Sequence, residues 1–353
     1  MKLWTPKRVL VTRSAAERPH GQEIVARCAA AGVTDIQLLP GDRLPRTDEG
    51  DPRATYALAK QTLAVVVSPP SKRRPQPIPP SADWRFDLAE GCPAHCQYCY
   101  LAGSLSGPPI TRAYANLDEI LGELDVKVGA GTVTSASPER AHEGTTFEAS
   151  CYTDPLGIEH VTGSLSAAVR HFGAHEFAGP VQLRFTTKYA DVDPLLGLDH
   201  RGRTRVRVSV NAAPVSTRFE GGTAPVDDRL TAAGKLAADG YPVGLVVAPV
   251  MPVDGWQEAY ADLLARAAGA IPATADLTIE CITHRFTPGS KETLLEWYPR
   301  TKLDLDESRR TQKRTKFGSV KHVYPKETMR ELRESLEGML AEHLPQARLL
   351  YWT

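Results

Sequence analysis

The 353-residue sequence lacks an excess of charge of either sign, because 42 Lys and Arg residues balance 42 Asp and Glu residues. No global field draws such a chain onto a polyanion, so any contact with nucleic acid requires a local patch of cations. The sequence also lacks an apolar run near the ~20 residues of a membrane-spanning helix. Its first residues, M-K-L-W-T-P-K-R, lack the apolar core of a signal peptide. We expect a cytoplasmic protein with no membrane partner.

Cysteine is scarce, with six in the chain, and three of the six lie within eight residues. In a reducing cytoplasm, cysteines are more often ligands, catalysts or core residues than disulfides. Residues 91–101 read G-C-P-A-H-C-Q-Y-C-Y-L and place Cys92, Cys96 and Cys99 at the spacing C-x3-C-x2-C. Three thiolates hold an iron-sulfur cubane and leave one iron open to a small molecule.

A zinc knuckle is the alternative interpretation of these cysteines. Structural zinc requires four protein ligands, usually from two C-x2-C or Cys/His pairs. His95 is available as a fourth ligand, but it lies between two of the cysteines and cannot easily close a tetrahedron with its own neighbours. The spacing therefore favours a 4Fe-4S cluster over zinc.

The cysteine motif resembles that of the radical S-adenosylmethionine superfamily, whose members chelate the cofactor at the open iron of such a cluster. Four further segments resemble the spore photoproduct lyase family: F-E-A-S-C-Y-T-D-P (147–155), F-T-T-K-Y-A-D-V-D (185–193), E-C-I-T-H-R-F-T (280–287) and K-H-V-Y-P-K-E (321–327). The resemblance extends from about Pro79 to the C-terminus. It implies repair of a thymine dimer in DNA, in which a 5′-deoxyadenosyl radical removes a hydrogen from the lesion, the bond joining the thymines breaks, and a thiol returns a hydrogen.

Strand-like and helix-like segments alternate along most of the chain, which predicts an α/β fold with parallel strands and helical crossovers. We expect strands at 145–150, 181–186, 206–210, 243–249 and 276–280, and helices at 117–128, 164–172, 226–238 and 256–268. The resemblance implies that these elements form a partial (β/α)6 TIM-type barrel of the radical S-adenosylmethionine type. In such barrels the chemistry lies at the C-terminal ends of the strands.

Three regions are expected along the chain. Residues 1–68 predict a small α/β region, with strands at 9–12, 34–39 and 63–68 and a helix at 15–31. The proline-rich residues 69–80 predict an extended connector, because proline removes backbone donors and fixes φ. Residues 81–353 then hold the barrel, a basic β-hairpin at about 300–326 and a closing helix. Thr328 is the expected helix cap, and the helix has an apolar stripe of Met329, Leu332, Leu336, Met339 and Leu340.

Three residues are the candidates for hydrogen transfer. Tyr98 and Tyr100 flank Cys99 and must lie near the cluster, and the resemblance implies that they relay hydrogen between a thiol and the cofactor. The resemblance also assigns Cys151 as the thiol that donates hydrogen to the thymine radical. From the residues alone, packing is the favoured role of both tyrosines, and a lone cysteine such as Cys151 is by default a small buried hydrophobe. Cys28 and Cys281 have no such support and are expected in the core.

The cofactor carries a carboxylate and an ammonium group, so its site requires cationic or hydroxyl partners. Lys188 and Ser209 match a lysine and a serine with this role in the family, and Thr153 stands where the family has a serine. Asp154 and Asn211 are weaker candidates, whose alternative role is capping or turn formation. A lysine at a strand end is otherwise usually a solvated charge.

A run of cations near the C-terminus is the candidate DNA contact. Residues 309–326 contain seven Lys and Arg residues and no acidic residue, enough to neutralise several phosphates, although such a run is often only a solvated face. The resemblance implies a hairpin that enters the duplex beside an extruded lesion. This chain reads K-R-T-K-F-G-S-V-K-H where the family hairpin is rich in Gly and Tyr, so the sequence specifies the lesion less firmly than the radical chemistry. The predicted DNA-binding residues are Arg309, Arg310, Lys313, Arg314, Lys316, Lys321, His322 and Tyr324.

The expected cofactors are a 4Fe-4S cluster and S-adenosylmethionine. The expected partners are DNA containing a thymine dimer and an electron donor such as flavodoxin or ferredoxin, with a monomer favoured. Two alternatives stay open at this point. One is a radical S-adenosylmethionine enzyme that acts on RNA or a small molecule, and the other is a non-catalytic zinc-bearing module that binds nucleic acid.

Overall fold

The computed structural model describes residues 3–47, 49–105, 107–314 and 320–353. The chain divides into two compact units. The first comprises Met1–Pro93, Pro108–Val206 and Asp239–Pro242, and the second comprises Ala94–Gly107, Arg207–Ala238 and Val243–Thr353. Within the described residues, no helix combines the length and apolar character that crossing a membrane requires.

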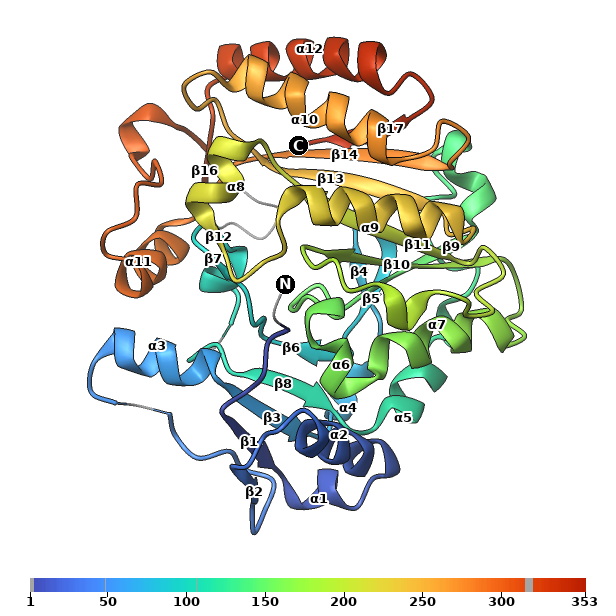
Figure 1. Ribbon diagram of the computed structural model, residues 1–353, viewed down its shortest axis with the longest axis vertical. Coiled ribbons are helices and arrows are strands. Elements are labelled where there is room, and N and C mark those ends of the chain that lie inside the picture. Colours follow the sequence, from blue (N-terminus) through green and yellow to red (C-terminus); the bar gives the residue numbers. More distant parts are fainter. Residues whose placement is uncertain (1–2, 48, 106, 315–319) are drawn as a thin grey trace. The chain divides into compact units, whose positions relative to one another are not determined.

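A five-stranded sheet lies at the N-terminal end of the first unit, in the order β2-β1-β3-β8-β6 (Figure 1). Its strands are β1 (Arg8–Val11), β2 (Ile36–Leu38), β3 (Thr62–Val66), β6 (Ala89–Glu90) and β8 (Thr111–Tyr114). All the pairs are parallel except β6 with β8. The predicted N-terminal strands are confirmed, but the sheet is not confined to residues 1–68, because β6 and β8 come from further along the chain.

Helices α1 (Arg13–Ala16), α2 (Pro19–Ala30) and α3 (Pro52–Lys60) accompany this sheet. The single helix predicted over 15–31 is wrong in one respect, since it is broken before Pro19. Arg18 has extended backbone, as expected for a residue that precedes proline. The α2 face toward the sheet buries Ile24 and Cys28 against Val9, Val11 and other apolar side chains.

The proline-rich stretch is more structured than the extended connector predicted from its composition. It forms the short helix α4 (Pro70–Arg73) and strand β4 (Gln76–Ile78), which pairs antiparallel with β5 (Ala82–Phe86). Pro70 stands in the first turn of α4, where its missing N–H costs nothing. Pro77 is accommodated because β4 is at the edge of its sheet.

The remaining strands of the first unit include those that precede Cys151 and Lys188 in the chain. Strand β9 (Thr145–Ala149) pairs parallel with both β5 and β10 (Val181–Thr187). Helices α5 (Leu117–Gly122), α6 (Glu159–Thr162) and α7 (Ser164–Ala174) belong to the same unit. The helix expected at 117–128 ends earlier than predicted, at Gly122.

Strand β11 (Thr204–Val210) begins in the first unit and ends in the second, where β13 (Val243–Val250), β14 (Leu277–Thr283) and β17 (Arg348–Trp352) pair in parallel. Helices α9 (Val226–Ala238), α10 (Trp256–Ala270) and α12 (Lys326–His343) lie along these strands (Figure 1). The predicted stripe of α12 packs as expected, with Leu332, Leu336 and Leu340 buried. The helix begins two residues before the predicted cap, because Pro325 is its N-cap.

The second unit also contains α8 (Ala213–Phe219), α11 (Pro288–Trp297), the two-residue strands β7 (His95–Cys96) and β12 (Glu220–Gly221), and a hairpin. The hairpin strands are β15 (Thr311–Arg314) and β16 (Val320–Val323), which pair antiparallel as predicted. Alternation of strands and helices is therefore borne out, and each of the five strands predicted after residue 140 is present within a few residues of its expected bounds.

Candidate active site

The cysteine motif is held by a short strand pairing, a backbone turn and a lysine side chain. In the second unit, β7 pairs antiparallel with β12, which aligns Cys96 with Glu220, and the Cys99 N–H donates to the Cys96 carbonyl at 3.3 Å. In the first unit, the Lys60 ammonium donates to the carbonyl of Cys92. All three cysteines are outside disulfides. The thiols required for a cluster are therefore present, each on a segment held by hydrogen bonds to neighbouring residues.

The candidate metal ligands do not converge on a single point. Among the residues that the structure describes, no three His, Cys, Asp or Glu side chains gather to hold a metal ion. The cysteines of a cubane bind separate irons, so they need not converge on one point as the ligands of a single ion do. The assignment of Cys92, Cys96 and Cys99 as cluster ligands stays a prediction.

Tyr98 is half-buried, and its hydroxyl reaches a buried ion pair of the second unit. Its hydroxyl donates a hydrogen bond to Oε1 of Glu220, and Oε2 of Glu220 lies 2.7 Å from the Arg229 guanidinium. Arg229 also donates to the backbone oxygens of Ser209, at 3.0 Å, and Ala224, at 2.8 Å. Burial, followed by the nearby Cys96 and Glu220, raises the pKa of Tyr98 well above its ordinary value. The phenol is therefore protonated at any physiological pH.

The other predicted relay tyrosine has a different environment. Tyr100 is 58% exposed, and it begins the 3-10 turn Tyr100–Gly103, which packs against α11. A side chain at Gly103 would approach Ser290 of α11 to 3.0 Å, so glycine permits this close packing. Tyr98, in contrast, packs on an apolar cluster that includes Phe219, Met251 and Phe286. The two tyrosines share a motif, but Tyr98 is half-buried whereas Tyr100 is exposed.

Cys151 follows a strained turn at the end of β9. Ser150 has a φ of 60°, in the left-handed region that side chains other than glycine seldom adopt. Its N–H donates to the Phe86 carbonyl at 2.7 Å, and its Oγ accepts from the Leu88 N–H at 3.0 Å. These two bonds hold the turn, which ends the strand and places Cys151 directly after it. The Cys151 side chain is half-buried.

Asp154 joins the turn after β9 to the end of β10. Its Oδ2 accepts from the Lys188 N–H at 2.6 Å, and its Oδ1 accepts from the Gly157 N–H at 3.3 Å. Burial raises the pKa of Asp154 to about 6, although these hydrogen bonds oppose the shift. The structure thus brings Lys188 and the Thr153–Asp154 segment together. Thr153 Oγ1 is buried without a hydrogen-bond partner, which fits a hydroxyl that meets a ligand.

Ser209 and Asn211 lie at the end of β11, and both are buried. The Asn211 amide is already occupied, because Nδ2 donates to the Pro249 carbonyl at 2.8 Å and Oδ1 accepts from Tyr260 at 3.0 Å. Asn211 therefore joins β11 to β13 and α10, which is the structural role considered as its alternative. The Ser209 carbonyl is the acceptor already described for Arg229.

The predicted DNA-binding residues separate into two groups. Arg309, Lys313 and Arg314 are exposed, and Lys321 is half-buried. Arg310, His322 and Tyr324 are buried instead: Arg310 lies 3.8 Å above the Tyr324 ring, and the His322 ring stacks on Phe286. These three side chains support the base of the hairpin and do not face solvent. Lys316 lies outside the described residues.

Cys28 and Cys281 are fully buried, as expected for core residues. Burial raises the pKa of Cys28 to about 11 and that of Cys281 to about 12, so neither thiol ionises near neutral pH. Sequence reasoning missed Glu220, Arg229 and Ser150. Glu220 is 122 residues from Tyr98, and no local pattern marks such a pair. Ser150 is part of the family-like segment 147–155 around Cys151, but no sequence pattern predicts its positive φ.

Comparison with known proteins gives consistent matches over the whole chain. A family model described as spore photoproduct lyase matches residues 4–353. Curated spore photoproduct lyases from a Geobacillus species and Bacillus subtilis are 40% and 37% identical, over 100% and 99% of both chains. A solved spore photoproduct lyase complexed with dinucleoside spore photoproduct is 37% identical, with a TM-score of 0.89 and full coverage of both chains. A mutant lyase with bound AdoMet and the same dinucleoside also has a TM-score of 0.89.

These matches and the tethered cysteine motif define a protein with the radical S-adenosylmethionine fold, and they confirm the predicted α/β half-barrel class. The identity over nearly the whole of each relative then decides the family. The chain belongs to the spore photoproduct lyase family.

Proposed function

We propose that this chain repairs spore photoproduct in DNA by radical S-adenosylmethionine chemistry and restores two thymines. The observation that carries the proposal is the full-length similarity, at 37% identity, to a lyase whose structure holds dinucleoside spore photoproduct. The bound AdoMet of a second such structure supports the same cofactor here.

The donor set fits a 4Fe-4S cluster held by Cys92, Cys96 and Cys99, because all three thiols are outside disulfides and lie within one short motif. When bound, the cluster supplies the electron for reductive cleavage of S-adenosylmethionine. Burial of Cys96 and partial burial of the other two restrict water around the site, which favours retention of a labile group.

Thr153, Lys188 and Ser209 are proposed to bind S-adenosylmethionine. Lys188 provides a cation for its carboxylate, and the Thr153 hydroxyl, buried without a hydrogen-bond partner, provides a polar contact. Asp154 acts as a positioning residue, since it holds the Lys188 backbone at 2.6 Å. Asn211 is proposed to position the end of β11 and does not itself contact the cofactor.

Cys151 is proposed to donate hydrogen to the thymine radical after the dimer bond has broken. The donation breaks the S–H bond and forms a C–H bond on the thymine, which leaves the radical on sulfur. Tyr98 and Tyr100 are proposed to relay a hydrogen atom from the cofactor to that sulfur, which re-forms the S–H bond and passes the unpaired electron through the phenols back to the cofactor. The protonated state of Tyr98, which its raised pKa ensures, is the state that this step requires.

The exposed cations of the hairpin are proposed to contact DNA phosphates. Lys313 and Lys321 lie opposite each other in the hairpin register, and like charges in that position destabilise a strand pair. Burial, Arg285 and Lys313 lower the pKa of Lys321. A polyanion relieves this repulsion, so the arrangement supports an interface with nucleic acid. Lys313→Gln/Arg314→Gln is expected to reduce the salt dependence of DNA binding by about two phosphate contacts.

Three properties stay predictions: a flavodoxin or ferredoxin as the electron donor, a monomeric state and a cytoplasmic location.

The decisive experiment for the function is anaerobic turnover of a defined dinucleoside spore photoproduct by the reconstituted protein. Cyclobutane and 6-4 thymine dimers serve as parallel substrates. Release of thymidine from spore photoproduct alone supports the proposal, whereas no release from it, or release only from another dimer, overturns it.

A further inference from the structure

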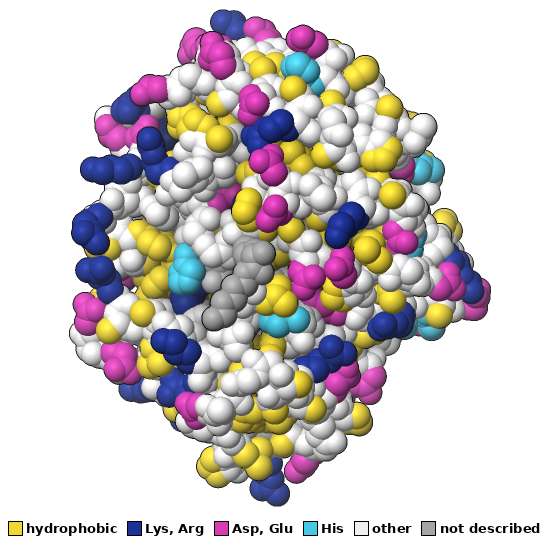
Figure 2. Space-filling model, viewed as in Figure 1, with side chains coloured by type: hydrophobic (Ala, Val, Ile, Leu, Met, Phe, Trp, Pro, Cys, Tyr) yellow, Lys and Arg dark blue, Asp and Glu magenta, His cyan; other side chains and the backbone are white. Residues whose placement is uncertain are grey.

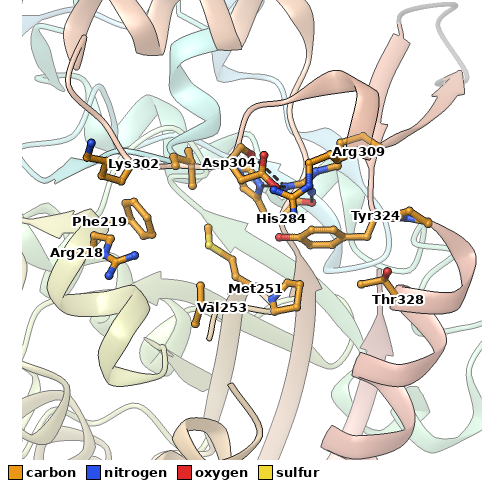
Figure 3. A pocket seen from close by; sticks show the side chains of 14 residues that line it. Arg218, Phe219, Met251, Val253, His284, Lys302, Asp304, Arg309, Tyr324 and Thr328 are labelled. Carbon is orange, nitrogen blue, oxygen red and sulfur yellow. Dashed lines mark hydrogen bonds and ion pairs between the residues drawn. The ribbon is translucent and has the colours of Figure 1, made fainter. Parts of the chain in front are cut away.

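A pocket of about 310 Å³ lies within the second unit, beside the base of the hairpin. Its apolar wall comes from Phe219 at the end of α8 and from Met251 and Val253 after β13. Figure 3 shows these side chains between Arg218 and Lys302 on one side and Asp304, Arg309 and Tyr324 on the other. The volume is at the lower end of the range for small-molecule sites, and it suits a group of nucleoside size.

The pocket is strongly cationic. Its lining includes Arg218, Lys302, Arg309 and Arg310, with Asp304 as the only carboxylate among the described lining residues, so four positive charges face one negative charge. The nearby His284 is neutral, because burial lowers its pKa to about 3. In a chain whose formal net charge is zero, such an excess is a local feature that attracts an anion.

The cations of the pocket differ in availability. Arg310 is held by Asp304, His284 and the Tyr324 ring, and Arg309 lies 3.4 Å from Asp304. Arg218 and Lys302 are exposed and are further from the carboxylate (Figure 3). An incoming phosphate therefore meets two solvated cations at one end of an apolar wall.

The pocket shares residues with the apolar cluster beside Tyr98 and is close in sequence to the hairpin strand β15. Phe219 and Met251 belong to the apolar cluster on which Tyr98 packs, and Arg309 stands two residues before β15, which carries Lys313 and Arg314. In Figure 2, Lys and Arg side chains lie along the left edge of the view, with Asp and Glu side chains among them. Arg309 thus connects the pocket lining along the chain to the cations of the hairpin strand.

We propose that this pocket holds a nucleotide of the DNA strand next to the lesion, with its phosphate on Arg218 and Lys302 and its sugar or base on Phe219, Met251 and Val253. This inference rests on the proposed function and adds a contact outside the lesion itself. A dinucleoside lesion has no flanking phosphates and cannot use the pocket, so the contact is specific to longer DNA.

The test compares the double variant Arg218→Gln/Lys302→Gln with wild type on two substrates. The first substrate is a duplex oligonucleotide containing spore photoproduct. For the double variant, the slope of log K for binding against log salt concentration is expected to be shallower by about two. The ratio of kcat/KM on the oligonucleotide to kcat/KM on the dinucleoside lesion is expected to fall about tenfold. The matched control is Lys235→Gln/Arg266→Gln, which removes one Lys and one Arg from α9 and α10 of the same unit.

Each outcome decides the proposal. An unchanged salt slope and an unchanged substrate ratio would overturn it. Equal losses on the oligonucleotide and the dinucleoside would also overturn it, because the pocket would then bind the lesion itself. Wild-type protein that binds DNA but fails to turn over the dinucleoside would refute the proposed function instead, and the salt slope would still report on the pocket.

Discussion

The phenol of Tyr98 donates its hydrogen bond to the carboxylate of Glu220, which is in turn paired with Arg229. The side chains of the ion pair are almost fully buried, with 1% and 0% exposure. A buried pair of this kind is costly to break on one side, because the remaining charge keeps its desolvation penalty without its partner. The environment of the candidate relay tyrosine is therefore fixed by charges far away in the sequence.

Glu220→Gln is expected to lower the free energy of unfolding by about 3 kcal/mol, because Arg229 would stay buried without an anion. Tyr98→Phe removes only a hydrogen bond to a charged group and is expected to cost about 1.5–2 kcal/mol. Urea unfolding measures both effects, and Glu258→Gln on the exposed side of α10 is the control. If Glu220→Gln were no more destabilising than Glu258→Gln, the ion pair would not be a buried anchor.

Replacement of any one of Cys92, Cys96 and Cys99 by Ala is expected to abolish reductive cleavage of S-adenosylmethionine, because two thiolates hold a cubane poorly. The measurements are iron and sulfide content after anaerobic reconstitution, and release of 5′-deoxyadenosine. Cys28→Ala, in the core of the first unit, is the control for loss of a thiol. A single-site variant with full iron content and wild-type cleavage would remove that cysteine from the ligand set.

Cys151→Ala is expected to leave cofactor cleavage intact and to degrade the products of repair, because the thiol acts only after the dimer bond breaks. Chromatography of the reaction should reveal by-products derived from the unquenched thymine radical. Cys281→Ala removes a thiol that is buried in β14 and is expected to leave product purity unchanged. Clean repair by the Cys151 variant would return this residue to a packing role.

Ser150 offers a test of backbone strain next to Cys151. Ser150→Ala retains the left-handed φ and leaves the buried Leu88 N–H without an acceptor, at a cost of about 1–3 kcal/mol. Ser150→Gly loses the same bond but relieves the left-handed conformation, worth about 1–2 kcal/mol. The glycine variant is therefore expected to be the more stable of the two in thermal or urea unfolding. The reverse order would show that the turn is unstrained.

Asp154→Asn is expected to change how stability depends on pH. The folded-state pKa of Asp154 is about 6, above its ordinary value of 3.8, so the folded protein holds the proton more tightly than the unfolded chain. The stabilisation is fully present below about pH 4 and is lost as the pH rises through 6, by roughly 3 kcal/mol. Urea unfolding at several pH values should show this decline in wild type and a smaller one in the variant. Parallel pH profiles would mean that Asp154 does not titrate in this range.

The sequence by itself determined the chemistry-bearing motif and the order of the elements. The spacing of Cys92, Cys96 and Cys99 is a local property, and the periodicity of apolar residues predicted β9, β10, β11, β13 and β14, because each pattern lies within a few consecutive residues. The prediction of an extended connector over residues 69–80 was wrong. An edge strand tolerates proline, and composition does not indicate which strands lie at an edge.

Tertiary structure alone decided which polar side chains meet. Three features depend on strands and loops that are distant in sequence but pack together. They are the pairing of Tyr98 with Glu220, the contact of Asp154 with Lys188, and the burial of Arg310, His322 and Tyr324. A run of cations looks uniform when read along the chain. The fold divides it into residues that face solvent and residues whose charges and rings support the hairpin, because burial is set by the neighbours that packing brings together and not by residue type.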